Sequence, residues 1–260
     1  FVVSGETIQP REVVEYFDTF RLLWNPLPSP PKRLAGVSIA SALGKLYVIG
    51  GHDRSNGQRS DTMFELQEHL IYSEPPASSE SMWKQLGVTL LNPRSAHDSV
   101  CYRNQIWIAG GTISSHANIT ACKVASTVEV FDPVYGTVTL GPPLQRDRID
   151  QTLLVANNNL YLYGIEVKGE TTSIEKLNTE LMQWEIVFST PRIRRYECVA
   201  VDPNNRNQIL IFGGDQPPTW DAFNVQTLSL TSSNNDSDLN NRSIPYRETM
   251  ISALAVSLPW

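Results

Sequence analysis

Cysteine and histidine are scarce in this chain. Its 260 residues include three cysteines and four histidines, and no cysteines stand in a Cys-x-x-Cys pair. This pattern predicts neither a zinc cluster nor a disulfide framework. We expect Cys101, Cys122 and Cys198 to be free thiols, with a Cys101–Cys122 bond as the alternative.

A long apolar run is also absent. No segment approaches the length needed to cross a bilayer, and no charged-then-apolar leader opens the chain. Because the first residue is Phe1 rather than methionine, we expect a fragment of a longer protein. We also expect no insertion into a membrane and a cytoplasmic location. The alternative is secretion or display at the cell surface, because N-glycosylation triplets begin at Asn118, Asn235 and Asn241.

Positively charged residues are fewer than negatively charged ones. Lysine and arginine number 21 against 27 aspartates and glutamates, which gives a net charge of −6 and an isoelectric point near 5.3. Binding to nucleic acid needs a basic face that neutralises phosphates, so nucleic acid is not an expected partner. A content of 41% hydrophobic and 18% charged residues is normal for a soluble all-β domain, and we expect one domain over residues 1–260.

An internal repeat dominates what is present. Apolar runs end in a glycine at residues 1–5, 46–50, 106–110, 160–164 and 209–213. Successive glycines are 45, 60, 54 and 49 residues apart, and the distance around the chain ends back to the first is 52. Short strands with a period of about 50 residues are the signature of a β-propeller.

Each repeat has further shared parts. An arginine opens a strand-like run some 16 to 18 residues before each glycine, and a third strand is clearest at residues 13–18 and 128–133. A fourth strand carries a tryptophan at Trp24, Trp83 and Trp184. Turns of glycine, proline and asparagine separate these runs. Each repeat therefore predicts four short antiparallel strands, which make one propeller blade.

The two chain ends complete the pattern. Residues 247–260 read as an arginine and a first strand, whereas residue 1 begins in a second strand. Joined, they would form one blade, so that strands from both termini close the ring and leave no open sheet edge. We therefore predict an all-β propeller of five blades; the alternative is a sixth blade within the polar stretch 229–244.

These features resemble the kelch repeat over the whole chain. The shared features are the arginine, a second strand ending in Gly-Gly at 50–51, 110–111 and 213–214, an aromatic-Asp third strand and the fourth-strand tryptophan. Residues 24–51 are the best match and are similar to a repeat of the BTB-kelch proteins. The chain departs from the pattern where Ile165 follows Gly164, and where the third and last repeats lack the tryptophan. BTB-kelch propellers commonly have more than five blades, so a sixth blade within residues 229–244 stays the alternative.

The arginines before the first strands are the first candidate binding residues. Since first strands line the channel of a propeller, we expect a ring at one rim made of Arg33, Arg94, Arg148, Arg195 and Arg247. Guanidinium groups can bind carboxylates or phosphates through two hydrogen bonds each. The resemblance implies the same use, because arginines at this position in kelch substrate receptors contact acidic peptides.

A structural role for these arginines is the alternative. Each could pair with an acid of a neighbouring blade, since acids lie within a few residues at Asp98, Asp147, Asp150, Glu197 and Glu248. We expect Arg94 and Arg148 to be the freest, because proline-containing turns precede them.

Loops that follow the glycines supply the remaining binding candidates. His52 lies in the polar segment 52–61, His116 in the segment 112–127, and Trp220 in the proline-flanked segment 216–221. Loops carry specificity on a rigid scaffold, and an exposed tryptophan can anchor a partner. The alternative is that Trp220 caps its own blade.

Catalysis has weaker support. Kelch-type propellers include copper oxidases, sialic-acid mutarotases and iron-using plant specifier proteins, but the histidines here match no copper site. The resemblance to specifier proteins implies weak metal candidates at Asp61, Glu65 and His69, whose spacing of four would put them on one face of a strand. Carbohydrate binding would use exposed aromatic residues, and Trp220 is the candidate that fits.

The sequence therefore predicts a protein–protein interaction module rather than an enzyme. We expect it to need no cofactor and to bind an acidic or phosphorylated peptide at the arginine-lined rim. The resemblance implies the substrate receptor of a ubiquitin-ligase adaptor, which would reach a cullin-type ligase through domains outside this chain. The alternatives are a propeller enzyme, a metal-binding specifier-like protein, or a secreted carbohydrate-binding propeller.

Overall fold

The computed structural model describes most of the chain in two compact units. The described residues are 2–3, 14–53, 55–72, 78–115, 118–169, 171–194, 197–214 and 219–232. One unit ends at Pro143 and the other begins at Leu144. Among the described residues, no helix has the length and hydrophobicity to span a bilayer.

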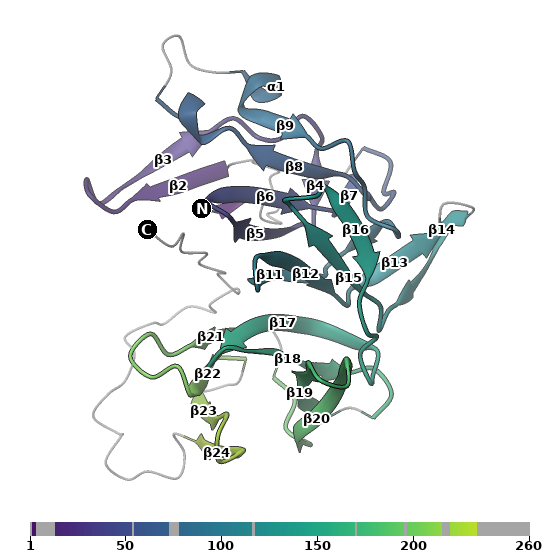
Figure 1. Ribbon diagram of the computed structural model, residues 1–260, viewed down its shortest axis with the longest axis vertical. Coiled ribbons are helices and arrows are strands. Elements are labelled where there is room, and N and C mark those ends of the chain that lie inside the picture. Colours follow the sequence, from purple (N-terminus) through teal and green to yellow (C-terminus); the bar gives the residue numbers. More distant parts are fainter. Residues whose placement is uncertain are drawn as a thin grey trace. The chain divides into compact units, whose positions relative to one another are not determined.

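The blades of the first unit are three antiparallel sheets that follow one another along the described chain (Figure 1). Blade 1 is a three-stranded sheet of β1 (Val2–Val3), β2 (Val14–Asp18) and β3 (Leu23–Leu27). Blade 2 has four strands, β5 (Ser38–Ala42), β6 (Lys45–Ile49), β8 (Met63–Leu66) and β9 (Trp83–Gln85). Blade 3 has four strands, β11 (Asp98–Tyr102), β12 (Gln105–Ala109), β15 (Val128–Asp132) and β16 (Thr137–Leu140).

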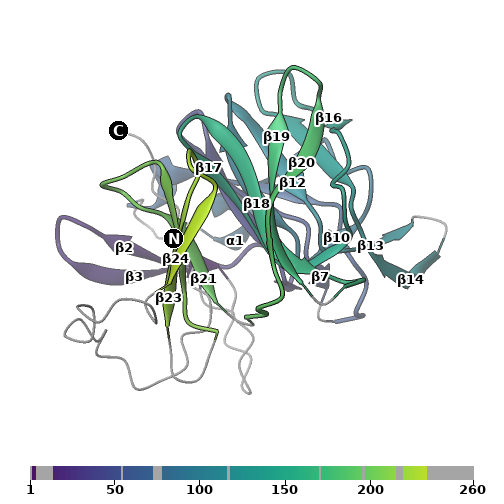
Figure 2. The same cartoon turned by 90° about the horizontal axis from the view of Figure 1, so that it is seen from below.

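The second unit contains two four-stranded sheets, whose strands are also seen in Figure 2. Blade 4 consists of β17 (Arg148–Ala156), β18 (Asn159–Glu166), β19 (Thr172–Asn178) and β20 (Gln183–Thr190). Blade 5 consists of β21 (Cys198–Val201), β22 (Gln208–Phe212), β23 (Trp220–Asn224) and β24 (Ser229–Ser232).

These sheets confirm the all-β, kelch-type propeller class. In every four-stranded sheet each strand pairs antiparallel with the next strand of its repeat, as a propeller blade requires. Blade 1 has three strands among the described residues, and the fourth was expected from residues 247–260, which lie outside them. The number of blades and the closure of the ring by both termini stay predictions.

The helices of the described chain are short and lie in blade 2. A 3-10 helix, η1 (Glu68–Leu70), directly follows β8, and α1 (Ser79–Met82) directly precedes β9. Ser78 caps α1 by accepting a hydrogen bond from the backbone N–H of Ser81. This insertion replaces the tight turn that joins the third and fourth strands elsewhere.

That tight turn has the same chemistry in the other blades. The third strand ends in an Asp or Asn whose side chain accepts two backbone N–H groups of the turn, at Asp18, Asp132, Asn178 and Asn224. The residue four positions later is left-handed, with φ of 55° at Leu22, 63° at Gly136, 50° at Met182 and 55° at Leu228. A short polar residue followed by a left-handed position reverses the chain into the fourth strand.

The second strands of blades 2, 3 and 4 are buried on both faces. In β6, Leu46 and Val48 pack with Phe64 and Trp83, whereas Tyr47 and Ile49 pack into a second cluster that includes Ile108 of blade 3. Burying such side chains contributes roughly 1.5–3 kcal/mol each. This two-sided burial explains why the second strands are continuous apolar runs rather than alternating ones.

The glycine that ends the second strand is required by close backbone approach. A Cβ on Gly50 would lie 2.8 Å from the carbonyl oxygen of Arg94, and one on Gly111 would lie 2.5 Å from that of Ser95. Both glycines have positive φ, at 59° and 75°. Where Ile165 follows Gly164, the strand instead continues to Glu166.

Small ribbons follow two of these glycines. In blade 2, β4 (Leu34–Ala35) pairs with β7 (His52–Asp53). In blade 3, β10 (Arg94–Ser95) pairs with β13 (Thr112–Ser115), which pairs with β14 (Asn118–Val124). The segment 112–127, expected to be a loop, is thus largely a β-ribbon.

Candidate functional site

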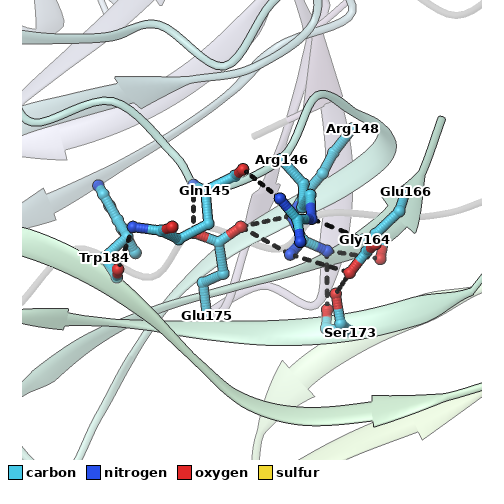
Figure 3. Close-up of polar contacts among 8 residues, drawn as sticks. All are labelled: Gln145, Arg146, Arg148, Gly164, Glu166, Ser173, Glu175 and Trp184. Carbon is cyan, nitrogen blue, oxygen red and sulfur yellow. Dashed lines mark hydrogen bonds and ion pairs between the residues drawn. The ribbon is translucent and has the colours of Figure 1, made fainter. Parts of the chain in front are cut away.

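Arg148 shows what the repeated arginine does in this fold (Figure 3). It is the first residue of β17, and its side chain is fully buried. Its Nε and Nη2 atoms donate to Oε1 of Glu175 at 3.0 and 2.6 Å. Its Nη1 donates to the carbonyl oxygens of Gly164 at 3.0 Å and Ser173 at 3.2 Å. The guanidinium group therefore joins the first, second and third strands of its own blade.

Arg94 makes the same contacts in blade 3. Nη2 donates to Oε1 of Glu129 at 2.5 Å, and both side chains are fully buried. Nη1 donates to the carbonyl oxygens of Gly110 at 3.3 Å and Thr127 at 3.2 Å.

Arg194 repeats the arrangement in blade 5. Nη1 donates to the carbonyl oxygens of Gly213 at 2.7 Å and Thr219 at 3.1 Å, and Nη2 donates to Oδ2 of Asp221 at 2.6 Å. We call each such buried arginine and its acid an arginine–acid pin; the pins are Arg94–Glu129, Arg148–Glu175 and Arg194–Asp221.

The acid of each pin also holds the chain that leads into its blade. Glu129 accepts the backbone N–H of Leu91 at 2.6 Å, and Glu175 accepts that of Gln145 at 2.9 Å. Both donors lie three residues before the arginine. Pro191 has no N–H to offer at this place in blade 5, and Arg192 instead lies 3.3 Å from Asp221 through its side chain. Each carboxylate therefore receives several charge-assisted hydrogen bonds.

The burial of these arginines has an electrostatic consequence. Burial lowers the pKa of Arg94, and the charge of Glu129 opposes that shift. A guanidinium group stays charged in proteins, so the pin is an ion pair. Removing one partner of a buried pair is strongly destabilising, at about 3–5 kcal/mol, because the remaining charge is left unpaired.

The expectation that Arg94 and Arg148 are free at the rim is wrong. Their side chains turn into their own blades, because a carboxylate of the third strand lies within reach there. The alternative expectation, in which each arginine pairs with an acid of a neighbouring blade, is also wrong for Arg94 and Arg148, because each pairs with an acid of its own blade. Arg195 and Arg247 lie outside the described residues, and Arg194, one position earlier, forms the pin of blade 5.

A sequence signal for the pins exists but was missed. The acid lies two residues after a Ser or Thr that opens the third strand, as in Thr127-x-Glu129, Ser173-x-Glu175 and Thr219-x-Asp221. The strand register confirms the equivalence, because each acid pairs with the residue two before its glycine: Glu129 with Ile108, Glu175 with Leu162 and Asp221 with Ile211.

Blade 2 departs from this arrangement. Its third strand has Thr62-Met63-Phe64, so Phe64 stands where the acid stands elsewhere, and it pairs with Val48 in the same register. Phe64 is fully buried in an apolar cluster. Leu34, rather than Arg33, stands at the position of the pin arginine, because Leu34 and Ala35 pair with Asp53 and His52 in the register in which Arg94 and Ser95 pair with Ile113 and Thr112. Leu34 is buried in the same apolar cluster as Phe64, and Arg33 is exposed.

Arg33 adjoins the segment that carries His52. Leu34 pairs with Asp53, and Ala35 pairs with His52, so the ribbon that follows Arg33 lies beside that segment. His52 is half-buried, as is Arg59, with which it forms a β-bridge. His52 therefore lies in the ribbon that Arg33 directly precedes, whereas His116 lies outside the described residues.

Trp220 does not lie in a loop. It opens β23, pairs with Phe212 and is half-buried. We expected this tryptophan in a proline-flanked loop. The strand instead begins directly after Thr219, whose carbonyl oxygen accepts a hydrogen bond from Arg194 of the pin.

The weak metal candidates do not share a strand. The third strand of blade 2 covers Met63–Leu66, so Glu65 lies on it, Asp61 precedes it and His69 lies in η1. Glu65 forms an ion pair with Lys45 at 3.0 Å. In the part of the chain that the structure describes, no three His, Cys, Asp or Glu side chains are placed to hold a metal ion.

Two buried titratable groups were missed by the sequence reasoning. His97 and Glu197 each lie three residues after a pin arginine and are buried. Burial, with the charge of Arg94, lowers the pKa of His97 to about 3, so this imidazole stays neutral. Burial raises the pKa of Glu197 to about 7, and the charge of Asp150 adds to the shift.

The cysteines agree with the expected free thiols where they are described. Cys101 and Cys198 are half-buried and lie outside any disulfide. Burial raises the pKa of the Cys101 thiol, which lowers its reactivity as a thiolate. The side chain of Cys122 lies outside the described residues.

Comparison with known proteins agrees with the fold. No family model matches the chain. The chain is 24% identical over 222 residues to Kelch repeat protein M-T8 of Myxoma virus (strain Lausanne), covering 84% of this chain and 39% of that protein. It is 26% identical over 196 residues to Kelch-like protein 23 of Homo sapiens, covering 74% of this chain and 31% of that protein. The resemblance to kelch-repeat proteins is confirmed.

The similarity extends beyond one kind of kelch-repeat protein. Beta-scruin of Limulus polyphemus is 25% identical over 219 residues, which cover 81% of this chain and 22% of that protein. The chain thus spans less than two-fifths of the length of these three relatives.

Proposed function

We propose that this kelch-type chain is a protein-interaction module that binds an acidic or phosphorylated peptide at the rim of its blades. Blades packed through two-sided apolar strands and pinned by buried ion pairs form a rigid scaffold. On such a scaffold, the segments between strands are left for recognition. The observation that carries the proposal is the exposed Arg33, which directly precedes the ribbon in which Ala35 pairs with His52.

The binding residues are fewer than the ring predicted from the sequence. Arg94 and Arg148 serve the pins, so within the described residues the binding role falls to Arg33, His52 and Trp220. Arg195, Arg247 and His116 remain part of the proposal as residues outside the described chain. The proposed ligand is anionic because arginine recognises carboxylate and phosphate groups through its planar fork.

The proposal extends to the protein of which this chain is a part. The relatives are considerably longer than the chain, and several of them are named kelch-like proteins. We propose that the chain is the substrate-recognition part of a cytoplasmic ubiquitin-ligase adaptor, and that other domains contact a cullin-type ligase. Sugar attached to Asn118 in protein from the native cell would contradict the cytoplasmic location.

A peptide-binding experiment tests the proposed function. The purified protein is titrated with a library of acidic and phosphorylated peptides at two salt concentrations. We expect saturable binding that weakens as salt rises, because charge-based contacts are screened. If no peptide of the library binds at either concentration, the proposed function is wrong.

A further inference from the structure

The segment that joins β7 to the third strand of blade 2 contains a chemically reactive pair, Asn56 followed by Gly57. Both residues are exposed, and no other asparagine of the chain precedes a glycine. The backbone nitrogen after an asparagine can attack the side-chain amide carbon, and a side chain on that next residue hinders the approach. Glycine has no side chain, and even a Cβ on Gly57 would meet nothing beyond its chain neighbours within 4 Å. The space around this nitrogen is therefore open.

The turn directs the two reacting groups toward each other. Oδ1 of Asn56 accepts the backbone N–H of Gln58 at 2.8 Å, a bond that reaches across Gly57. Such a bond folds the asparagine side chain forward along the main chain, toward the Gly57 nitrogen. Attack by that nitrogen places negative charge on Oδ1, and the Gln58 N–H is already in position to stabilise this charge.

One hydrogen bond opposes the attack. The Gly57 N–H donates to the carbonyl oxygen of Asp53 at 2.7 Å, and the nitrogen has to lose this proton before it forms a new bond. The N–H of Asp53 donates in turn to the carbonyl oxygen of Gln58 at 2.7 Å, which closes the turn. We therefore expect the reaction to be slower in the folded chain than in the unfolded one, yet faster than at an asparagine that precedes a bulky residue.

We propose that Asn56 is the site at which the folded chain deamidates. The Gly57 nitrogen gives up its proton to water and bonds to Cγ of Asn56, while the bond from Cγ to the side-chain nitrogen breaks. That nitrogen takes up a proton and leaves as ammonia, and the product is a cyclic succinimide. Water then opens the ring. Cleavage between Cγ and the Gly57 nitrogen leaves aspartate, whereas cleavage between the main-chain carbonyl carbon and that nitrogen leaves isoaspartate. Water is the only co-reactant, and nothing is oxidised or reduced.

The products differ from asparagine in charge and in backbone length. Both add a negative charge to the segment after β7, and isoaspartate also adds one carbon to the main chain. The longer chain no longer matches the spacing of the Gly57–Asp53 and Asp53–Gln58 bonds, so the turn opens. Arg59, which follows, donates through Nε to the carbonyl oxygen of Thr112 in the ribbon of blade 3 at 3.1 Å. An opened turn therefore loosens a contact between blades 2 and 3. This inference is independent of the proposed peptide binding.

The chain offers a matched control at Asn205. Its Oδ1 also accepts the backbone N–H two residues on, that of Asn207 at 3.2 Å, but Arg206 follows it in place of a glycine. The purified protein is incubated at pH 8 and digested in acid at intervals. Mass spectrometry of the peptides follows conversion at each asparagine, and enzymatic methylation detects isoaspartate. We expect Asn56 to convert at least about tenfold faster than Asn205, because the arginine side chain keeps its own backbone nitrogen from close approach.

Incubation of the same protein in urea tests the role of the fold. We expect Asn56 to convert roughly two- to tenfold faster there, which is what the opening of one hydrogen bond is worth. Gly57→Ala should slow the conversion about tenfold in urea, where the strain that alanine meets at a φ of 70° is absent. The proposal is wrong if Asn56 stays intact in the folded protein over the time in which it converts fully in urea. It is equally wrong if Asn56 converts no faster than Asn205.

Discussion

The arginine of the pins is replaced by a different residue in blade 2. Arg148 is buried beside Glu175, whereas blade 2 has buried Leu34 at the arginine position and Phe64 at the acid position. Both members of the pin are thus replaced together by apolar side chains that share one cluster. A count of arginines before first strands cannot show which of them occupies the pin position, because Arg33 lies one residue away from it.

Glu197 gives the first prediction at the scale of single residues. Burial raises its pKa to about 7, with Asp150 adding to the shift and Tyr163 and Arg194 opposing it. In the unfolded chain a glutamate titrates near 4.3. The folded state therefore keeps its proton where the unfolded state has lost it, and stability falls as pH rises from about 4.5 to 7.

Glu197→Gln should remove this dependence, because glutamine does not titrate. We expect the variant to gain roughly 1–3 kcal/mol relative to wild type between pH 4.5 and pH 8. The measurement is urea-induced unfolding of both proteins at the two pH values. A difference in unfolding free energy that is the same at both would contradict the buried carboxyl.

At the scale of elements, the turns between third and fourth strands follow a local rule. Asp132 and Asn178 cap their turns in the same way, but the left-handed position is Gly136 in one and Met182 in the other. A side chain in the left-handed region costs roughly 1–2 kcal/mol, a cost that glycine avoids.

Exchanging the residues at these two turns should have opposite effects. A Cβ on Gly136 would meet no atom within 4 Å, so strain in the backbone alone opposes a larger residue there. We expect Gly136→Leu to lower the free energy of unfolding by roughly 1 kcal/mol, and Met182→Gly to raise it by about 0.5 kcal/mol after the added freedom of the unfolded chain is counted. Denaturant unfolding of both variants measures this. Equal losses in both would show that the turns differ in ways the capping contacts do not explain.

The sequence predicted the elements better than it predicted the side chains' roles. The second strands, the glycine stops and the fourth-strand tryptophans follow from local patterns, and Trp83 and Trp184 lie in β9 and β20 as expected. The burial of Arg94 depends on the register of β12 and β15, which places Glu129 within reach. Trp220 was misplaced for a related reason, since strand pairing with Phe212 overrides the neighbouring prolines.

At the scale of the whole molecule, Arg94 also connects two successive blades of the first unit. The carbonyl oxygen of Arg94 accepts the N–H of Gly51 at 2.8 Å, and its own N–H donates to the carbonyl oxygen of Ser60 at 3.1 Å. The backbone of Arg94 is therefore bound to blade 2 while its side chain is bound to blade 3. Loss of such a residue should weaken both blades together.

The central claim is that the arginines before the first strands divide into buried structural pins and exposed arginines outside the pins, and thermal unfolding tests it most directly. Melting temperatures are measured for wild type, Arg94→Gln and Arg33→Gln under one set of conditions. We predict that Arg94→Gln lowers the melting temperature by on the order of 10 °C, because it leaves Glu129 buried without its partner, and that Arg33→Gln changes it by less than about 2 °C. Equal shifts in the two variants, large or small, would contradict the division of roles.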